Sequence, residues 1–144
     1  MIQHIIHQDI FYAIIVRSNF QKEGIEFFTP NEFSQQLGYM NRPKDYVIEP
    51  HVHLKTMREV TYTQEVLLIR SGKVRVDFYT QEMQYFASEI LHQGDIILLA
   101  LGGHGFEMLE PTEMIEVKQG PYNADVDKRK FSPDANQIIS AYKK

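Results

Sequence analysis

Residues 64–79 read Gln64-Glu65-Val66-Leu67-Leu68-Ile69-Arg70-Ser71-Gly72-Lys73-Val74-Arg75-Val76-Asp77-Phe78-Tyr79 and predict two consecutive β-strands. The second half alternates polar and apolar side chains, which is typical of a strand with one buried face. Ser71-Gly72 between the halves indicates a hairpin turn. In the first half, Glu65 shares a face with Leu67 and Ile69, because successive side chains of a strand point to opposite sides. We therefore expect Glu65 to point inward and Gln64 to share the solvent face of Arg70.

Further strand-like segments recur along the chain, separated by turn residues. They cover residues 10–16, 46–53, 84–91, 96–101, 105–109 and 114–118. Strands that recur at this spacing predict an all-β sandwich or barrel. Two short helices are also expected. Thr29-Pro30-Asn31-Glu32 is typical of a helix start and predicts a helix near residues 30–37, and Ser132-Pro133 predicts a C-terminal helix that runs towards Tyr142.

Composition argues against several classes of protein. At 144 residues the chain is long enough for one domain with a buried core. The net charge of −4 and the pI near 5.8 argue against a nucleic-acid partner, because phosphate binding needs a basic surface. The absence of cysteine excludes disulfides, thiolate zinc sites and cysteine nucleophiles. The start of the chain lacks the pattern of a signal peptide, and the longest apolar run is too short to span a bilayer, so we expect a cytoplasmic protein without a membrane partner.

The longest apolar run, residues 10–16, predicts how the protein assembles. This predicted strand is apolar on both faces. In a thin two-layer fold, the outer face of such a strand needs a cover. A partner subunit is the commonest cover and two-fold dimers are the commonest oligomers, so we expect a homodimer. The alternative is that the C-terminal helix packs over this strand within one chain.

Three histidines are candidate metal ligands. His51 and His53 are two residues apart in the predicted strand 46–53, so both imidazoles would point to the same side. His104 follows the predicted strand 96–101, and Glu65 supplies a carboxylate between them. Imidazoles together with a carboxylate suit iron, manganese, zinc, nickel or copper. The pattern therefore predicts a site for one divalent transition metal ion.

These residues form two motifs that resemble those of the cupins, a superfamily of small jelly-roll β-barrels. The first cupin motif has the form G-x5-H-x-H-x(3–4)-E-x6-G, and the chain is similar to it at His51, His53, Glu65 and Gly72. The second has the form G-x5-P-x-G-x2-H-x3-N, and the chain is similar to it at Gly94, Gly102 and His104.

The resemblance implies a single jelly-roll domain over residues 1–144, with the barrel at about residues 46–118. It also implies that His51, His53, Glu65 and His104 are the metal ligands inside the barrel. Two strings, at residues 36–40 and 116–122, resemble an uncharacterised cupin branch that is often associated with bacterial surface-sugar biosynthesis.

The chain departs from both motifs. Residues 54–64 make the gap between His53 and Glu65 longer than in the motif, and Ala100 and Met108 stand at the proline and asparagine positions. Glu59 and Gln64 are therefore alternatives to Glu65 as the fourth ligand.

The inserted segment 54–60 would lie at the mouth of the barrel. Arg58 in this segment could clamp an anionic substrate, with Gln64 nearby, because a guanidinium group binds carboxylates and phosphates in a bidentate way. The alternative interpretation is an arginine on a solvated loop.

The expected function follows from the proposed ligands and the resemblance. The first hypothesis is a metal-dependent enzyme that acts on a small polar molecule, such as a sugar or a keto acid, by isomerisation or oxygenation. The second is a non-catalytic sugar-binding or regulatory cupin. The third is a metal-free isomerase that uses His51 or His53 as its base.

Overall fold

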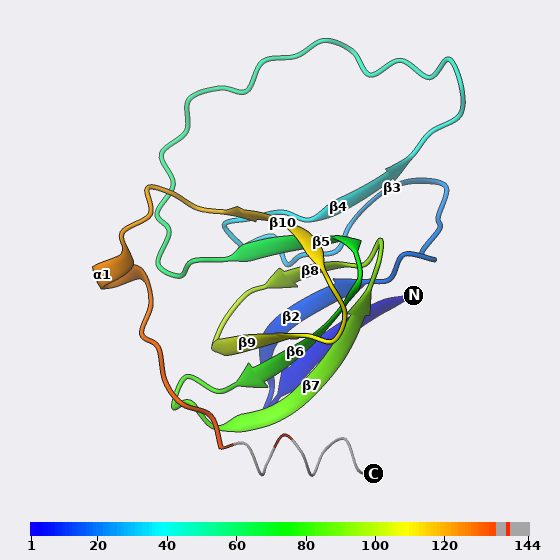
Figure 1. Ribbon diagram of the computed structural model, residues 1–144. Coiled ribbons are helices and arrows are strands. Elements are labelled where there is room, and N and C mark those ends of the chain that lie inside the picture. The colour runs from blue at the N-terminus through cyan, green and yellow to red at the C-terminus, as the bar shows by residue number, and fades with distance from the viewer. Residues whose placement is uncertain (135–137, 139–144) are drawn as a thin grey trace.

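Ten β-strands make up most of the regular structure in the computed structural model, which describes residues 1–134 and 138 (Figure 1). The strands are β1 (Ile2–His7), β2 (Ile10–Val16), β3 (Gly24–Phe27), β4 (Gly38–Asn41), β5 (Glu65–Ser71), β6 (Lys73–Tyr79), β7 (Tyr85–His92), β8 (Ile96–Leu99), β9 (Gly103–Met108) and β10 (Glu113–Lys118). A short helix, α1 (Ala124–Asp127), follows them. The fold is all-β, as the sequence predicts.

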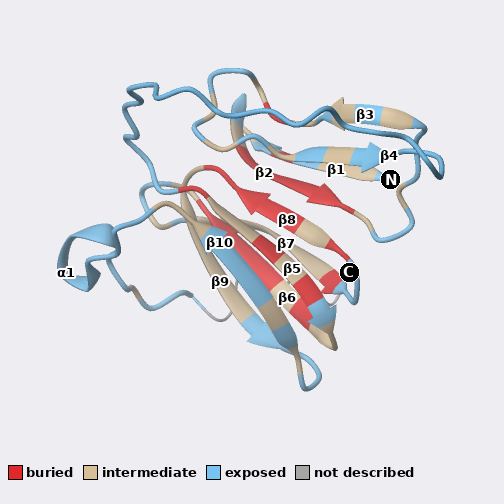
Figure 2. Cartoon of the chain, turned by 90° about the horizontal axis from the view of Figure 1, so that it is seen from above, coloured by how far each residue is buried: buried red, intermediate tan, exposed pale blue. Residues whose placement is uncertain are grey.

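The strands form three antiparallel sheets. The largest has the order β1-β2-β8-β5-β10, and the second has the order β7-β6-β9. β3 and β4 pair separately, on the side of the five-stranded sheet that faces away from β6, β7 and β9 (Figures 1 and 2). The described strands therefore form a sandwich of two open sheets, with the β3–β4 pair outside it.

The hydrophobic core fills the space between the two larger sheets. Leu67 and Ile69 of β5 belong to the same buried cluster as Val76 and Phe78 of β6, and all four are at most 5% exposed. Val76 and Phe78 lie on the predicted inner face of β6, but Asp77 and Tyr79 on its other face are also buried, at 4% and 3% exposed. Glu65 lies on the same face of β5 as Leu67 and Ile69, so its side chain points to the inter-sheet space at the start of that strand.

The turn at Gly72 differs from the predicted hairpin. β5 and β6 do not pair with each other, because the chain leaves the five-stranded sheet at Ser71 and enters the other sheet at Lys73. Gly72 has a φ of +83°, and a Cβ atom there would lie 2.2 Å from the carbonyl oxygen of Pro111. Only glycine fits this crowded left-handed position, so Ser71-Gly72 forms a corner between sheets.

β2 is buried on both faces within one chain. Residues 12–16 are each at most 6% exposed. The loop between β3 and β4 reaches this strand, where the rings of Phe11 and Phe33 lie 5.6 Å apart in an edge-to-face arrangement. The face that we expected a partner subunit to cover is therefore already covered by the chain itself.

The predicted strand 46–53 is wrong. These residues are exposed and belong to no sheet, and the segment between β4 and β5 forms a long excursion from the sandwich (Figure 1). Pro50 lacks the N–H that a strand ladder needs. Val47 and Val52 are 73% and 81% exposed, so the β-prone side chains of this segment find no buried face to pack on.

The predicted helix near residues 30–37 is replaced by turns. The backbone N–H of Leu37 donates to Thr29 Oγ1 at 3.2 Å, and the side-chain amide of Gln36 donates to the carbonyl oxygens of Pro30 and Phe33. These side-chain bonds satisfy the backbone groups that a helix would have paired. The predicted C-terminal helix falls mostly on residues 135–137 and 139–144, which lie outside the described residues. No helix in the described part is both long and apolar enough to cross a membrane.

A buried ion cluster ties the two larger sheets together. Asp95, which precedes β8, is 2% exposed, and Arg17 follows β2. Arg17 donates to Asp95 Oδ2 at 3.0 Å and to Glu89 of β7 at 2.9 Å. The Asp95 carboxylate also accepts hydrogen bonds from the backbone N–H groups of Ser18 at 2.8 Å and His92 at 3.0 Å.

Candidate functional site

Glu65 and His104 meet between the two larger sheets. Glu65 is the first residue of β5, and His104 is the second residue of β9 in the other sheet. His104 Nε2 lies 3.1 Å from Glu65 Oε2, and the two side chains are 27% and 18% exposed. The sandwich therefore brings together two of the four predicted ligands, a carboxylate and an imidazole, from strands about forty residues apart.

Lys118 adds a positive charge to this pair. The antiparallel register of β10 and β5 places Lys118 directly opposite Glu65, and Lys118 Nζ lies 3.8 Å from Glu65 Oε1. The hydrogen bond with His104 and the charges of His104 and Lys118 lower the pKa of Glu65, and partial burial opposes them. Glu65 is therefore held as a carboxylate, which is the protonation state that a metal ligand needs.

Lys118 also pairs with a second carboxylate on its own strand. Its Nζ lies 3.1 Å from Glu116 Oε1, and this hydrogen bond is the main reason why the pKa of Lys118 is raised. The ammonium group lies 4.9 Å from the centre of the Tyr122 ring, within the range of a cation–π contact. Glu65, His104, Lys118 and Glu116 thus form a polar cluster at one end of the sandwich, at the edge of the apolar core.

His51 and His53 lie apart from this cluster. Both are exposed residues of the segment between β4 and β5. Their ring centres are 5.3 Å apart, and His51 Nδ1 lies 2.9 Å from the carbonyl oxygen of Glu49. In the described part of the chain, no three His, Asp or Glu side chains are arranged to hold a metal ion. The four predicted ligands therefore form two separate pairs, and metal binding stays a prediction.

Arg58 and Glu59 lie on the same exposed segment as the two histidines. Glu59 lines a hollow that also contains Gln64, whereas Arg58 does not line it. The proposed role of Arg58 as an anion clamp stays a prediction.

Gln64 is buried, although its predicted strand face is that of Arg70. Its side chain is covered by the loop between β3 and β4, where its Oε1 accepts hydrogen bonds from the backbone N–H of Gln35 at 3.0 Å and from Ser34 Oγ at 3.3 Å. Its own backbone N–H donates to Gln119 Oε1 at 2.7 Å. Gln64 is only 6% exposed as a result. Alternation along one strand could not reveal this, because the covering loop is about thirty residues away.

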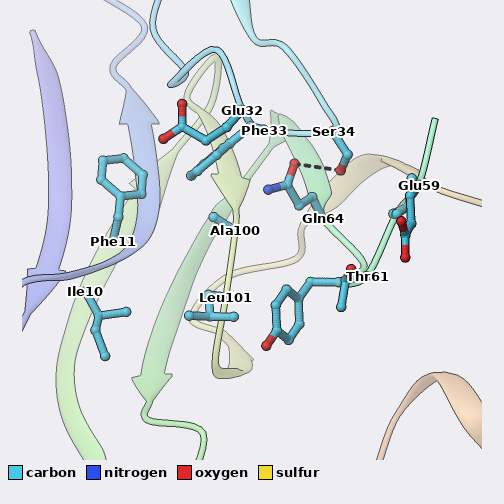
Figure 3. A pocket seen from close by; sticks show the side chains of 12 residues that line it. Ile10, Phe11, Glu32, Phe33, Ser34, Glu59, Thr61, Gln64, Ala100 and Leu101 are labelled. Carbon is cyan, nitrogen blue, oxygen red and sulfur yellow. Dashed lines mark hydrogen bonds between the residues drawn. The ribbon is translucent and has the colours of Figure 1, made fainter.

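A hollow of about 390 Å³ opens beside Gln64 (Figure 3). Its walls come from four separate parts of the chain, namely residues 10–11, 32–34, 59–62 together with Gln64, and 100–101. The sequence carries no local signal for such a site, because its aromatic residues look like ordinary core residues until the fold places them around one space.

No protein-family model, curated protein sequence or solved structure matches this chain.

Proposed function

We propose that the protein is a small jelly-roll protein of the cupin type that binds one divalent transition metal ion. Glu65, His104, His51 and His53 would be its ligands. The observation that carries the proposal is the contact of Glu65 with His104 in the space between the sheets, at 3.1 Å. Two ligand atoms that each lie about 2.1 Å from one ion, at a right angle, are themselves about 3 Å apart, so this spacing suits two neighbouring ligands of one metal.

The sheet topology supports the jelly-roll part of the proposal. From β7 onward, successive strands alternate between the sheets: β7 and β9 belong to the three-stranded sheet, and β8 and β10 to the five-stranded one. Such crossing of successive strands between two packed antiparallel sheets is a feature of jelly rolls. It also explains why Glu65 and His104 come from opposite sheets.

His51 and His53 would have to join Glu65 and His104 for a four-ligand site to form. Their rings already lie together, and their segment is exposed and outside the sheets. A movement of this segment towards the open end of the sandwich would not disrupt any strand pairing. A metal held there would supply Lewis-acid chemistry to a small polar substrate such as a sugar or a keto acid. Isomerisation and oxygenation are the candidate reactions.

Metal content of the freshly purified protein tests this proposal. We expect about one transition metal ion per chain by elemental analysis, and its loss in a His51→Ala/His53→Ala double variant and in His104→Ala. His92→Ala is the matched control, because His92 is an exposed histidine away from the cluster. A metal-free wild-type protein that also fails to bind added Zn²⁺, Mn²⁺, Ni²⁺ or Fe²⁺ would exclude the proposal.

A non-catalytic binding protein is the second candidate, and the Glu65 cluster favours it. The charge of Glu65 is compensated by His104 and Lys118 of the chain itself. A folded, ligand-binding protein whose stability does not change when metal is removed with a chelator would support this alternative.

A further inference from the structure

The hollow beside Gln64 lies on the other side of the five-stranded sheet from Glu65. Gln64 and Glu65 are adjacent in an extended chain, so their side chains point in opposite directions. Glu65 faces His104 in the inter-sheet space, whereas Gln64 faces the loop between β3 and β4. The hollow is therefore distinct from the Glu65–His104 cluster, and it shares with the proposed metal site only the segment between β4 and β5, which contributes Glu59 and Tyr62 to its wall.

The Gln64 side chain presents an unused hydrogen-bond donor to this hollow. Because a backbone N–H can only donate, the atom that faces the N–H of Gln35 must be the carboxamide oxygen. The amino group is then the free end, and it has no hydrogen-bond partner among the described residues. Figure 3 shows the oxygen turned to Ser34 and the nitrogen turned the other way, towards Phe33 and Ala100.

A closed set of hydrogen bonds fixes the orientation of this donor. Ser34 Oγ donates to Gln64 Oε1, the Gln119 side-chain amide donates to Ser34 Oγ at 3.0 Å, and the Gln64 backbone N–H donates to Gln119 Oε1. A side chain that is 94% buried and held from two sides loses little conformational entropy when a ligand binds. The amino group is accessible from the hollow, so a ligand with an acceptor atom can replace the water that would otherwise bind there.

The other walls of the hollow define what that ligand must be. Glu32 and Glu59, both exposed, are among the lining residues, and none of the described lining residues is Lys or Arg. An anionic ligand would be repelled here. Phe11, Phe33 and Tyr62 contribute aromatic surface, which requires an apolar face on the ligand.

The hollow offers the amide donor of Gln64 and the acidic residues Glu32 and Glu59. A hydroxyl group suits both, because it can accept a hydrogen bond from an amide and donate one to a carboxylate. We propose that this hollow binds an uncharged sugar. A hydroxyl oxygen of the sugar accepts from Gln64 Nε2, other hydroxyls donate to Glu32 and Glu59, and the C–H face of the ring packs on the aromatic side chains. The volume of about 390 Å³ is in the range of small-ligand pockets. A keto acid or a nucleotide-linked sugar phosphate does not fit this site, because each carries negative charge.

Nuclear magnetic resonance titration of the full chain tests the proposal. The probes are the methyl pyranosides of glucose, galactose, mannose and N-acetylglucosamine, added separately, with glucuronate as a ring-matched anion. We expect at least one neutral glycoside to shift the side-chain amide signals of Gln64 and the ring signals of Phe33, and glucuronate to bind at least about tenfold more weakly. The proposal is overturned if no neutral glycoside shifts these signals up to roughly 50 mM, or if glucuronate binds more tightly than every neutral sugar.

Two variants tie the binding to the hollow. Gln64→Glu keeps the acceptor for Gln35 and Ser34 but removes the free amino group, so it should weaken sugar binding by at least about tenfold. Gln84→Glu is the matched control, because Gln84 is exposed and does not line the hollow. Phe33→Leu, which removes an aromatic wall without removing the loop, should weaken binding severalfold.

Unchanged affinity in both Gln64→Glu and Phe33→Leu would overturn the proposal. Loss of bound metal from Gln64→Glu would also overturn it, since Gln64 would then act at the metal. In His104→Ala, sugar binding that persists would support the sugar site, and loss of metal would support the metal proposal. The two proposals can therefore fail separately.

Discussion

Replacing Asp95 by asparagine tests whether the ion cluster between the sheets stabilises the fold. The carboxylate accepts three hydrogen bonds, from Arg17, Ser18 N and His92 N. A carboxamide has one acceptor oxygen, and its best orientation keeps that oxygen facing Arg17 and His92 and turns the NH2 group to Ser18. One hydrogen bond is then lost, and a buried N–H is left without an acceptor, at a cost of about 1–3 kcal/mol.

The loss of the ion pair adds to this cost. Arg17 and Asp95 are 17% and 3% exposed, so their attraction is only weakly screened, and Arg17 keeps Glu89 as a partner. Removing one partner of a buried pair costs about 3–5 kcal/mol when nothing replaces it. Because Arg17 stays paired, we expect Asp95→Asn to lower the free energy of unfolding by about 3 kcal/mol, which corresponds to a fall in Tm of roughly 9 °C.

Urea unfolding followed by circular dichroism and tyrosine fluorescence measures this loss. The matched control is Glu107→Gln, which removes the partner of Arg75 at a side chain that is 57% exposed, and which should cost less than about 1 kcal/mol. If Asp95→Asn loses less than about 1 kcal/mol, or no more than Glu107→Gln, the cluster does not clamp the sheets as we argue.

Two further predictions concern pH and assembly. The pKa of Glu65 is lowered from its ordinary value of 4.5, so its contribution to stability is present above that pH and is lost as the pH falls through the lowered pKa. Glu65→Gln should therefore be less stable than the wild type at neutral pH, with a difference that shrinks in acid; an equal difference at both pH values in urea unfolding would contradict this. We also still expect a homodimer, because Ile115 and Val117 on the edge strand β10 are 45% and 57% exposed, and light scattering that gives a mass near 16.9 kDa would reject it.

The sequence predicted β2 and β5 to β10 but missed β1, β3 and β4, and it did not predict the partner of each strand. β6 was predicted at its observed bounds, because strict alternation of Val74, Val76 and Phe78 with polar residues has no other regular solution. Ser71-Gly72 was predicted as a hairpin, yet Gly72 turns the chain into the other sheet. A glycine with a positive φ can form either a hairpin or a corner between sheets. The crowding of Gly72 by Pro111 distinguishes the corner, and Pro111 is distant in the sequence.

The candidate site was predicted in part. Glu65 was expected to face inward, and it does. The sequence sufficed here because the alternation along β5 involves only neighbouring residues. The strand expected at residues 46–53 does not form, so the spacing of His51 and His53 does not place them on a sheet. An alternating pattern forms a strand only where a neighbouring strand offers hydrogen bonds and a buried face. The segment 46–53 has neither, because Pro50 lacks an N–H and Val52 stays exposed.

The sequence by itself determined the all-β class, the inward direction of Glu65 and the absence of thiol chemistry, because alternation and residue type are properties of neighbouring positions. Only the tertiary structure decided that His104 reaches Glu65 across the sandwich, that Lys118 lies opposite it, and that the loop between β3 and β4 buries Gln64 beside a hollow. Those contacts join residues that are far apart in the chain. They depend on sheet order and register, which follow from how the whole chain buries its apolar surface.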